Sequence, residues 1–401
     1  MNTRNLTVDS KRIQRVKEIA TSLVEQRQFN SIEWCITHKR SVVDQGSVGQ
    51  ADLANNIALP AKPIYRIYSM TKPIVSVAAL RLIENGELIL SAPVKIYLPE
   101  FAAAGVIQAD GSVASTEDQA MTVEHLLTHR SGLSYDFLPD CEVAELYRQH
   151  NLVGRGDLSL KAFVEELAKL PLAFKPGSEW KYSYSTDVLA RVIEVVRNQP
   201  LAEALNDLIF RPCAMDETGF RLNAEQKTRL LPSFGQQSLD VARPLPEGQH
   251  KLNPMNVEQG HPTDSEQFAR GGHGLYSTTS DYLKFMHMLY DGCAPDGVAV
   301  LSAPMTQMMW NDRIPPAQKP LQISGDVMGG YGWNLFGRVM INTGESDFLT
   351  SVGEGGWSGA AATYFWVDRE SELGGIVMTQ YLGSTVPLGP LIKSAAYQAM
   401  V

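Results

Sequence analysis

The chain has 401 residues, of which 44% are apolar and 20% are charged, and its formal net charge is -9. This composition is typical of a soluble globular protein with a large core, and the negative charge without any basic cluster argues against nucleic acid as a partner. No stretch approaches the roughly 18 consecutive apolar residues of a membrane-spanning helix, so no membrane partner is expected.

The N-terminal segment and the cysteines both favour a cytoplasmic protein. Residues 13–24 carry apolar side chains at helical spacing, which predicts an amphipathic helix rather than the continuous apolar segment of a secretory signal. The cysteines lie far apart and form no C-x-x-C pair, so the sequence indicates neither a disulfide framework nor a zinc knuckle. We therefore expect reduced thiols at Cys35, Cys141, Cys213 and Cys293.

Residues 32–37 and 41–48 predict the two strands of a hairpin, and the next informative stretch is Ser69-Met70-Thr71-Lys72. Apolar residues follow it at three- and four-residue spacing, with Pro73 in the first turn and Asn85-Gly86 at the end, which predicts a helix of about four turns. Because residues three apart are neighbours on a helix, Ser69 and Lys72 should face the same way, beside unpaired backbone N–H groups. This arrangement would suit nucleophilic catalysis. The alternative is that Ser69 is an N-cap and Lys72 a solvated lysine.

An S-x-x-K pair is by itself a weak signal, because a chain of this length should contain about one by chance. A second copy, Ser178-Glu179-Trp180-Lys181, follows the turn residues Pro176-Gly177 and has no apolar helical stripe after it. We therefore interpret Ser178 as a loop serine.

Residues 92–261 form an irregular region of short predicted helices separated by loops, and residues 231–262 predict an extended surface segment. The predicted helices of this region are 122–129, 158–170, 186–198 and 201–210, and two more are expected at 279–290 and 302–310.

The last part of the chain changes to strands. Residues 332–341, 357–367 and 375–380 predict three strands with short connections, which implies antiparallel pairing, and residues 387–400 predict a closing helix. We expect an α/β fold of the α+β type, with one antiparallel sheet flanked by the N- and C-terminal helices. Its domains would be an α/β domain of residues 1–91 and 271–401, and a mainly helical domain of residues 92–270.

Three other motifs are weaker signals when each is taken alone. Tyr182 lies between a turn and a predicted helix, where a phenol could reach a cleft, although a packed tyrosine is the commoner state. The glycines of residues 353–359 precede a strand rather than a helix, so they argue against a dinucleotide loop and leave a strand N–H that could bind an oxyanion. His125 and His129 would share one helical face, but a third ligand is not evident, so we interpret them as structural and expect no metal and no cofactor.

Together these stretches resemble a known superfamily over about residues 64–380. The chain is similar to the serine β-lactamases and penicillin-binding proteins, in particular to their class C branch and the related family VIII carboxylesterases. Four blocks in the right order carry the resemblance: RIYSMTK (66–72), HLLTHRSGL (125–133), GGHGLYST (271–278) and GGWSGAAATY (355–364).

The departures from the class C pattern favour an esterase. Class C lactamases have Tyr-x-Asn where this chain has Tyr182-Ser183-Tyr184, and Lys-Thr-Gly where it has Trp357-Ser358-Gly359. The chain therefore lacks an amide and a cation that would hold a β-lactam, contacts worth about 1.5–3 kcal/mol each. A Trp-x-Gly third motif is similar to that of the family VIII esterases, and an aromatic wall favours an uncharged, apolar ester.

The resemblance implies that Ser69 attacks an ester carbonyl and forms an acyl-enzyme, while Lys72 and Tyr182 carry protons. Which of these two is the general base stays open. The oxyanion would lie between the backbone N–H groups of Ser69 and Ala360. The other substrate contacts that the resemblance implies are Trp357, Gly359 and Tyr184.

We therefore predict a serine carboxylesterase for small or short-chain esters, with a small-molecule substrate and no cofactor. One alternative is a β-lactamase or D-amino-acid peptidase on the same fold, which the missing third-motif lysine and the absent export signal oppose. Another is a non-catalytic binding or sensor protein, which the joint presence of Ser69, Lys72 and Tyr182 opposes. The oligomeric state is unknown from the sequence.

Overall fold

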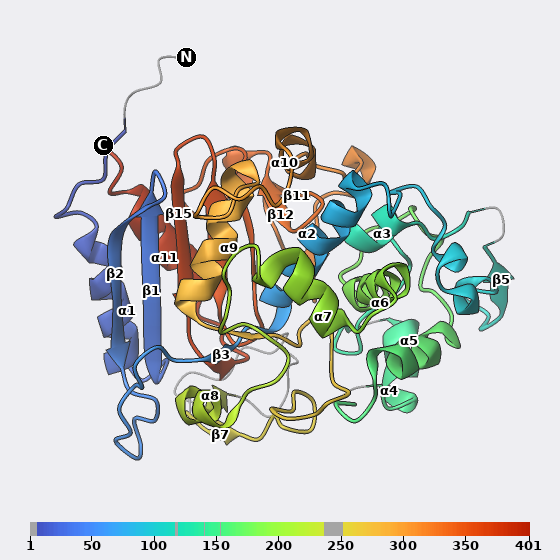
Figure 1. Cartoon of the computed structure of the whole chain (residues 1–401), viewed down its shortest axis with the longest axis horizontal. Helices are drawn as coiled ribbons and strands as arrows, with labels where there is room; N and C mark the ends of the chain where they lie inside the picture. The colour runs from blue at the N-terminus through green and yellow to red at the C-terminus, as the bar shows by residue number, and fades with distance from the viewer. Residues whose placement is uncertain (1–5, 117–118, 140, 153, 236–251) are drawn as a thin grey trace.

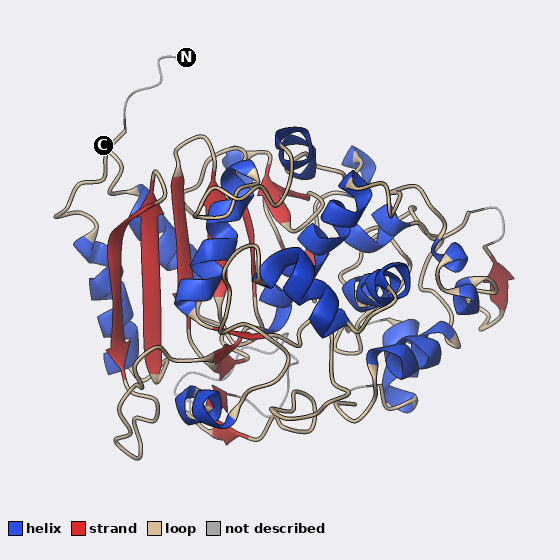
Figure 2. Ribbon diagram, viewed as in Figure 1, coloured by secondary structure: helices blue, strands red, loops and turns tan. Residues whose placement is uncertain are grey.

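The computed structural model describes residues 6–116, 119–139, 141–152, 154–235 and 252–401. Its centre is a seven-stranded sheet in the order β11-β12-β13-β14-β15-β1-β2, in which every neighbouring pair is antiparallel (Figures 1 and 2). The strands are β1 (Ser31–His38), β2 (Ser41–Gly49), β11 (Tyr331–Trp333), β12 (Arg338–Met340), β13 (Gly355–Ser358), β14 (Tyr364–Asp368) and β15 (Leu373–Met378). The predicted fold class, an α+β fold with an antiparallel sheet built from both ends of the chain, is confirmed.

Two of the segments predicted as single strands are hairpins, in which a turn separates two shorter strands. Residues 332–341 contain parts of both β11 and β12, because the Asn334 side chain accepts hydrogen bonds from the backbone N–H groups of Phe336 and Gly337 and closes a turn. Residues 357–367 contain the end of β13 and most of β14, with Ala362 in the left-handed region at φ 60°. These turns interrupt apolar runs, so the sequence pattern alone did not separate the strands.

Helices cover both faces of the sheet. The N- and C-terminal helices flank it, as predicted. On one face, α1 (Gln14–Glu25) and α11 (Leu388–Tyr397) share a core with Trp34 and Ile36. On the other, α9 (Thr279–Asp291) packs in the core that contains Cys35. This division follows from the pleat of β1, whose successive side chains point to opposite faces.

Helix α2 (Thr71–Glu84) is the buried centre of the molecule (Figure 1). Every residue from Thr71 to Leu80 is buried, which is the pattern of a helix enclosed on all sides. Just past its end, Gly86 has φ 75°, the left-handed conformation that glycine adopts without strain. The predicted four-turn helix after Ser69 is therefore confirmed.

The remaining helices are α3 (Val123–Leu127), α4 (Glu142–Gln149), α5 (Leu160–Ala168), α6 (Ser185–Arg197), α7 (Leu201–Leu205), α8 (Ala224–Arg229) and α10 (Ala303–Met309). Most of them gather beside the sheet, while α8 and α10 lie near its lower and upper ends (Figures 1 and 2). The division into domains at residues 92 and 270 stays a prediction. In the described part of the chain, no helix has both the length and the apolar character needed to cross a bilayer.

The other strands are short. They are β3 (Tyr65–Arg66) with β8 (Tyr276–Ser277), β4 (Gly105–Ile107) with β5 (Val113–Ser115), β9 (Gln322–Ile323) with β10 (Asp326–Val327), and β6 (Ser233–Gly235) between β7 (Pro254–Met255) and β16 (Tyr381–Leu382). Much of the predicted surface segment 231–262, namely residues 236–251, lies outside the described residues.

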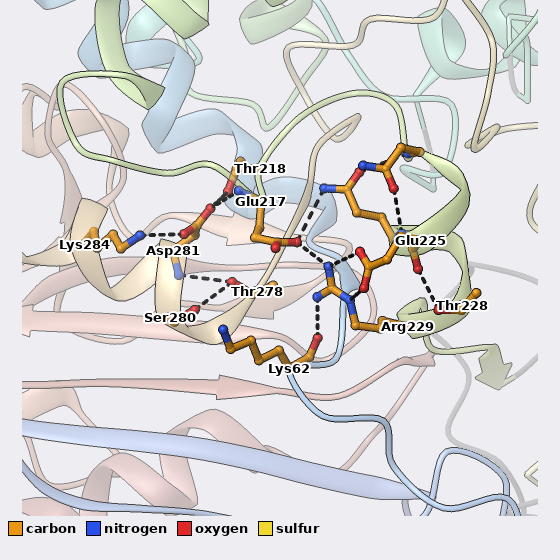
Figure 3. A network of polar contacts seen from close by, with 12 residues as sticks. Lys62, Glu217, Thr218, Glu225, Thr228, Arg229, Thr278, Ser280, Asp281 and Lys284 are labelled. Carbon is orange, nitrogen blue, oxygen red and sulfur yellow. Dashed lines mark hydrogen bonds and ion pairs between the residues drawn. The ribbon is translucent and has the colours of Figure 1, made fainter.

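The β3–β8 pair leads directly into Ser69 and is supported from behind by a polar network (Figure 3). Asp281, in the first turn of α9, accepts hydrogen bonds from the Glu217 backbone N–H and from the Thr218 hydroxyl. The Glu217 side chain in turn pairs with Arg229 at 2.6 Å, which ties α8 to the same loop. Gly219, which follows Thr218 in the chain, forms an antiparallel β-bridge with Tyr276 of β8. The network therefore fixes the strand that positions the start of α2.

Candidate active site

Ser69 lies in a single 3₁₀ turn, Tyr68–Met70, immediately before α2. Tyr68 has φ 42°, which a bulky residue rarely adopts and which costs about 1–3 kcal/mol. The residue at the N-cap of α2 is Met70, and no side-chain hydrogen bond caps this end. The Ser69 hydroxyl instead accepts a hydrogen bond from Lys72 Nζ at 3.1 Å. The N-cap alternative for Ser69 is therefore wrong.

Lys72 is a buried amine, not a solvated one. Its side chain is 1% exposed, and besides Ser69 it donates to the backbone carbonyl of Gly272 at 2.7 Å. Burial lowers the pKa of Lys72 from its ordinary value to about 7, while the negative charge of Asp187 acts in the opposite direction. The Lys72 amine is therefore far more often uncharged at neutral pH than an ordinary lysine, and in the uncharged form it can accept a proton.

Asp187 is a residue of the site that the sequence analysis missed. It lies in the first turn of α6 and is fully buried, and its Oδ1 accepts from the Gly272 backbone N–H at 3.1 Å. Burial raises the pKa of Asp187, and Lys72 lowers it. A Cβ on residue 272 would lie 2.4 Å from Asp187 Oδ2, so any larger residue here would have to displace that carboxylate. Gly272 thus contacts Asp187 through its N–H and Lys72 through its carbonyl.

Tyr182 brings a phenol to the same serine. It lies in the loop before α6 and is 5% exposed, and the Ser69 side chain is near enough to lower the pKa of the Tyr182 phenol. The Tyr182 hydroxyl also accepts a hydrogen bond from Trp357 Nε1 at 3.0 Å. Burial raises the pKa of Tyr182, so the phenol holds its proton at neutral pH. The structure therefore brings together Ser69, Lys72 and Tyr182.

The two histidines of the second block do not share a helical face. Helix α3 ends at Leu127, and His129 has φ 54°. The His125 ring accepts a hydrogen bond from the Thr122 backbone N–H at 3.3 Å and caps α3, while the His129 ring packs 4.8 Å from the Tyr182 ring. Among the described residues, no group of three or more His, Cys, Asp or Glu is arranged to hold a metal ion.

A cavity of about 260 Å³ opens beside Ser69. Its described lining residues are Tyr68, Ser69, Tyr135, Asp136, Phe137, Gly154, Tyr184, Met255, Val257, Gly260, His261, His273, Ala360 and Leu382. Most of these are aromatic or aliphatic. The lining includes the predicted nucleophile Ser69, both predicted oxyanion residues (Ser69 and Ala360) and Tyr184.

The roles of Trp357 and Gly359 as substrate contacts stay predictions. Trp357 is 4% exposed and packs 4.5 Å from Trp333, and neither it nor Gly359 lines the cavity that holds Ser69. Strand alternation turns the indole into the core behind Tyr182, where its N–H binds the phenol. Glycine at position 359 lets the end of β13 pass close to the backbone of Ile67, because a Cβ there would lie 2.4 Å from the Ile67 carbonyl oxygen.

A model of the Beta-lactamase family matches residues 16–397, nearly the whole chain. The chain belongs to the Beta-lactamase family. Esterase EstB from Burkholderia gladioli is 28% identical over 388 residues, covering 94% of this chain and 92% of that protein. The resemblance inferred from the four sequence blocks is confirmed.

Solved structures show the same fold. EstCE1, described as a hydrolase with promiscuous acyltransferase activity, matches with a TM-score of 0.80 and 22% identity over 97% of this chain and 99% of its own. A family VIII carboxylesterase matches with a TM-score of 0.71 and 18% identity over 99% of this chain and 100% of its own.

In this member of the Beta-lactamase family, two amides are free to bind an oxyanion. In the part of the chain that the structure describes, neither the Ser69 N–H nor the Ala360 N–H donates a hydrogen bond. Both residues line the cavity, and Ala360 is exposed. The side chains of Lys72 and Tyr182 lie next to each other, with Lys72 Nζ 4.6 Å from the centre of the Tyr182 ring.

Proposed function

We propose that this chain is a serine carboxylesterase that hydrolyses small or short-chain esters through an acyl-enzyme on Ser69. The observation that carries the proposal is the hydroxyl of Ser69 in a cavity, 3.1 Å from a buried amine that itself lies 4.6 Å from the ring centre of the buried Tyr182 phenol. At the coarser level of a serine carboxylic ester hydrolase of the Beta-lactamase family, the prediction is confirmed by the family match and by the similarity to Esterase EstB.

Lys72 is the general base in this proposal. Burial lowers the pKa of Lys72 to about 7, so its uncharged form is far more populated at pH 7 than that of an ordinary lysine. The neutral amine takes the hydroxyl proton as Ser69 attacks the ester carbonyl. The Gly272 carbonyl accepts from the same amine and holds it in position.

Tyr182 is the proton donor to the leaving alkoxide. The raised pKa of Tyr182 keeps the phenol protonated until the ester C–O bond breaks. Transfer of the phenol proton to the departing alcohol leaves a tyrosinate, which the Trp357 N–H stabilises and which the proton held by Lys72 then neutralises. Water enters next, loses its proton to the same pair of groups and releases the acid from Ser69.

The oxyanion of each tetrahedral intermediate binds the backbone N–H groups of Ser69 and Ala360. An oxyanion-hole donor typically contributes about 2.7–4 kcal/mol of transition-state stabilisation. A lysine or arginine is missing among the described residues that line the cavity, so a β-lactam carboxylate would lack a cationic partner there. This is the reason to place ester hydrolysis ahead of β-lactam hydrolysis.

The test compares p-nitrophenyl butyrate with a chromogenic cephalosporin, each followed past one turnover. Steady ester hydrolysis with little lactam opening is the expected result. The reverse ratio would support the β-lactamase alternative, and a single stoichiometric burst or no reaction would support the sensor alternative.

Ser69→Ala should abolish ester turnover, and the matched control is Ser178→Ala. Ser178 belongs to the second S-x-x-K stretch, but its hydroxyl bonds to the Lys175 carbonyl in an exposed loop, so this variant should keep full activity. Mass spectrometry of the enzyme after reaction with a p-nitrophenyl phosphonate should locate the adduct on Ser69. An active Ser69→Ala variant would show that the nucleophile is another residue.

A further inference from the structure

The cavity beside Ser69 has an unusual combination of walls. Aromatic rings surround it, and they come from Tyr68, Tyr135, Phe137, Tyr184, His261 and His273. One acidic side chain, Asp136, lies among the described lining residues, and these include neither lysine nor arginine. The site is therefore aromatic and negatively charged.

The Asp136 carboxylate has spare capacity to bind a ligand. Its Oδ1 accepts a hydrogen bond from the Tyr184 hydroxyl, which fixes the carboxylate at the cavity wall. Its Oδ2 receives no hydrogen bond from any described residue, and it is not among the enclosed polar atoms. A carboxylate has four acceptor positions, so most of those on Asp136 remain open.

No lysine or arginine of the described residues forms an ion pair with the Asp136 carboxylate, although the charge of Arg148 lowers its pKa. The neighbouring Arg148 donates to the backbone carbonyl of Asp136 rather than to its carboxylate, and it also pairs with Glu145 in solvent. Burial raises the pKa of Asp136, as expected for a carboxylate that has lost water without gaining a salt bridge.

The rings next to Asp136 form a continuous wall. The Tyr135 and Phe137 rings stack with centroids 4.8 Å apart and an interplanar angle of 22°, and the Tyr135 and Tyr184 rings are 4.4 Å apart. The faces of aromatic rings attract cations, most strongly where water is excluded. A carboxylate at the edge of such a wall supplies the full negative charge that the rings lack.

We propose that this cavity selects esters that carry an ammonium group, with the cation held between the Asp136 carboxylate and the aromatic wall. The proposal rests on the ester hydrolysis proposed above and names its preferred substrate class. Uncharged esters of the same size remain weaker substrates, and esters that carry a carboxylate are repelled. In each turnover one water and one ester give one acid and one ammonium-bearing alcohol.

A matched pair of substrates tests the charge alone. Butyrylcholine and 3,3-dimethylbutyl butyrate have nearly the same shape and differ in a quaternary nitrogen against a quaternary carbon. Their kcat/KM values are measured in a pH-stat at pH 7.5. The wild type should prefer butyrylcholine by about tenfold or more, and Asp136→Asn should lower that preference by about tenfold.

The control removes a negative charge from the same neighbourhood without touching the cavity. Glu142 is an exposed acid at the start of α4, and Glu142→Gln should leave the preference for butyrylcholine unchanged. In Asp136→Asn, the amide oxygen can still accept from the Tyr184 hydroxyl, so thermal unfolding should show a folded protein. Inhibition of the wild type by choline against 3,3-dimethylbutanol gives the same comparison without any variant.

Equal kcat/KM for the two esters in the wild type, or an unchanged preference in Asp136→Asn, would overturn the proposal. Failure of the esterase assignment gives a different result, because then neither of these esters nor p-nitrophenyl butyrate would be hydrolysed. Even if no ester is hydrolysed, the affinities of both esters for Ser69→Ala, measured by calorimetry, show whether the cavity prefers the ammonium ester. Equal affinities there would refute the ammonium site independently of turnover.

Discussion

The hydrogen bond from Trp357 to Tyr182 gives a sharp test of how the phenol acts. The variant Trp357→Phe keeps an aromatic ring against Trp333 and removes the N–H that lies 3.0 Å from the Tyr182 hydroxyl. Without this donor the pKa of Tyr182 should rise further, because the bond now lowers it. The phenol would then become harder to deprotonate when it gives its proton to the leaving group.

The size of the effect depends on the charge that develops on Tyr182. A hydrogen bond to a charged oxygen is worth about 1.5–3 kcal/mol, whereas one to a neutral oxygen is worth about 0.5–1.5 kcal/mol. Since about 1.4 kcal/mol corresponds to a tenfold change in rate, a tyrosinate-like transition state predicts a fall in kcat of about 10- to 100-fold. A phenol that stays neutral predicts a fall of less than about tenfold.

The assay is the steady-state hydrolysis of p-nitrophenyl butyrate, with kcat and KM measured separately. An interaction formed in the transition state lowers kcat and kcat/KM together and leaves KM nearly unchanged. The matched control is Trp333→Phe, because the Trp333 indole also lies in this core but donates to the Leu127 carbonyl at 3.1 Å.

Equal losses in the two tryptophan variants would refute the reasoning, since they would reflect packing alone. A change confined to KM would also refute it and would return the Trp357 indole to a direct contact with substrate.

Other consequences of the site can be measured directly. The kcat/KM for esters should rise as the pH increases through about 7, because Lys72 accepts a proton only when it is uncharged and its pKa is about 7. The variant Lys72→Arg carries a permanent positive charge, so it should lower kcat/KM at least about a hundredfold and remove this rising limb from the pH profile. Asp187→Asn removes a negative charge that raises the pKa of Lys72, so the same limb should move to lower pH, and a limb that stays or moves up would contradict the assigned interaction. Gly359→Ala places a methyl group 2.4 Å from the Ile67 carbonyl oxygen and should cost about 1–3 kcal/mol in unfolding free energy. Its control in chemical denaturation is Gly219→Ala, whose Cβ would have its nearest contact at 3.8 Å, and equal stability of the two variants would refute the steric argument.

The sequence predicted those parts of the fold whose signals, such as apolar spacing and residues that end a helix, lie within one short segment of the chain. Helix α2 was predictable because its apolar spacing and Asn85-Gly86 lie within one short stretch. The β13–β14 hairpin was not, because the segment Ala360-Ala361-Ala362 contains no residue typical of a turn. Gly359, at the start of this turn, instead packs closely against the backbone of the distant Ile67.

The same distinction holds for the site. Ser69 and Lys72 are neighbours on one helix, so their encounter follows from spacing alone. Asp187 and Gly272 are 85 residues apart, and no periodicity connects them. For Trp357, strand alternation predicts two opposite faces, but which face meets Tyr182 is decided by the packing of the whole sheet.

The order of the chain also sets when the catalytic centre can first exist in the cell. Ile67 and Thr363, whose contact closes the strand end against the nucleophile turn, are separated by 296 positions. A ribosome adds about 5–20 residues per second, so roughly 15–60 s pass between synthesis of these two segments. During that interval the nascent polypeptide carries its serine without the second amide. Hydrolytic competence therefore arises only after nearly complete translation.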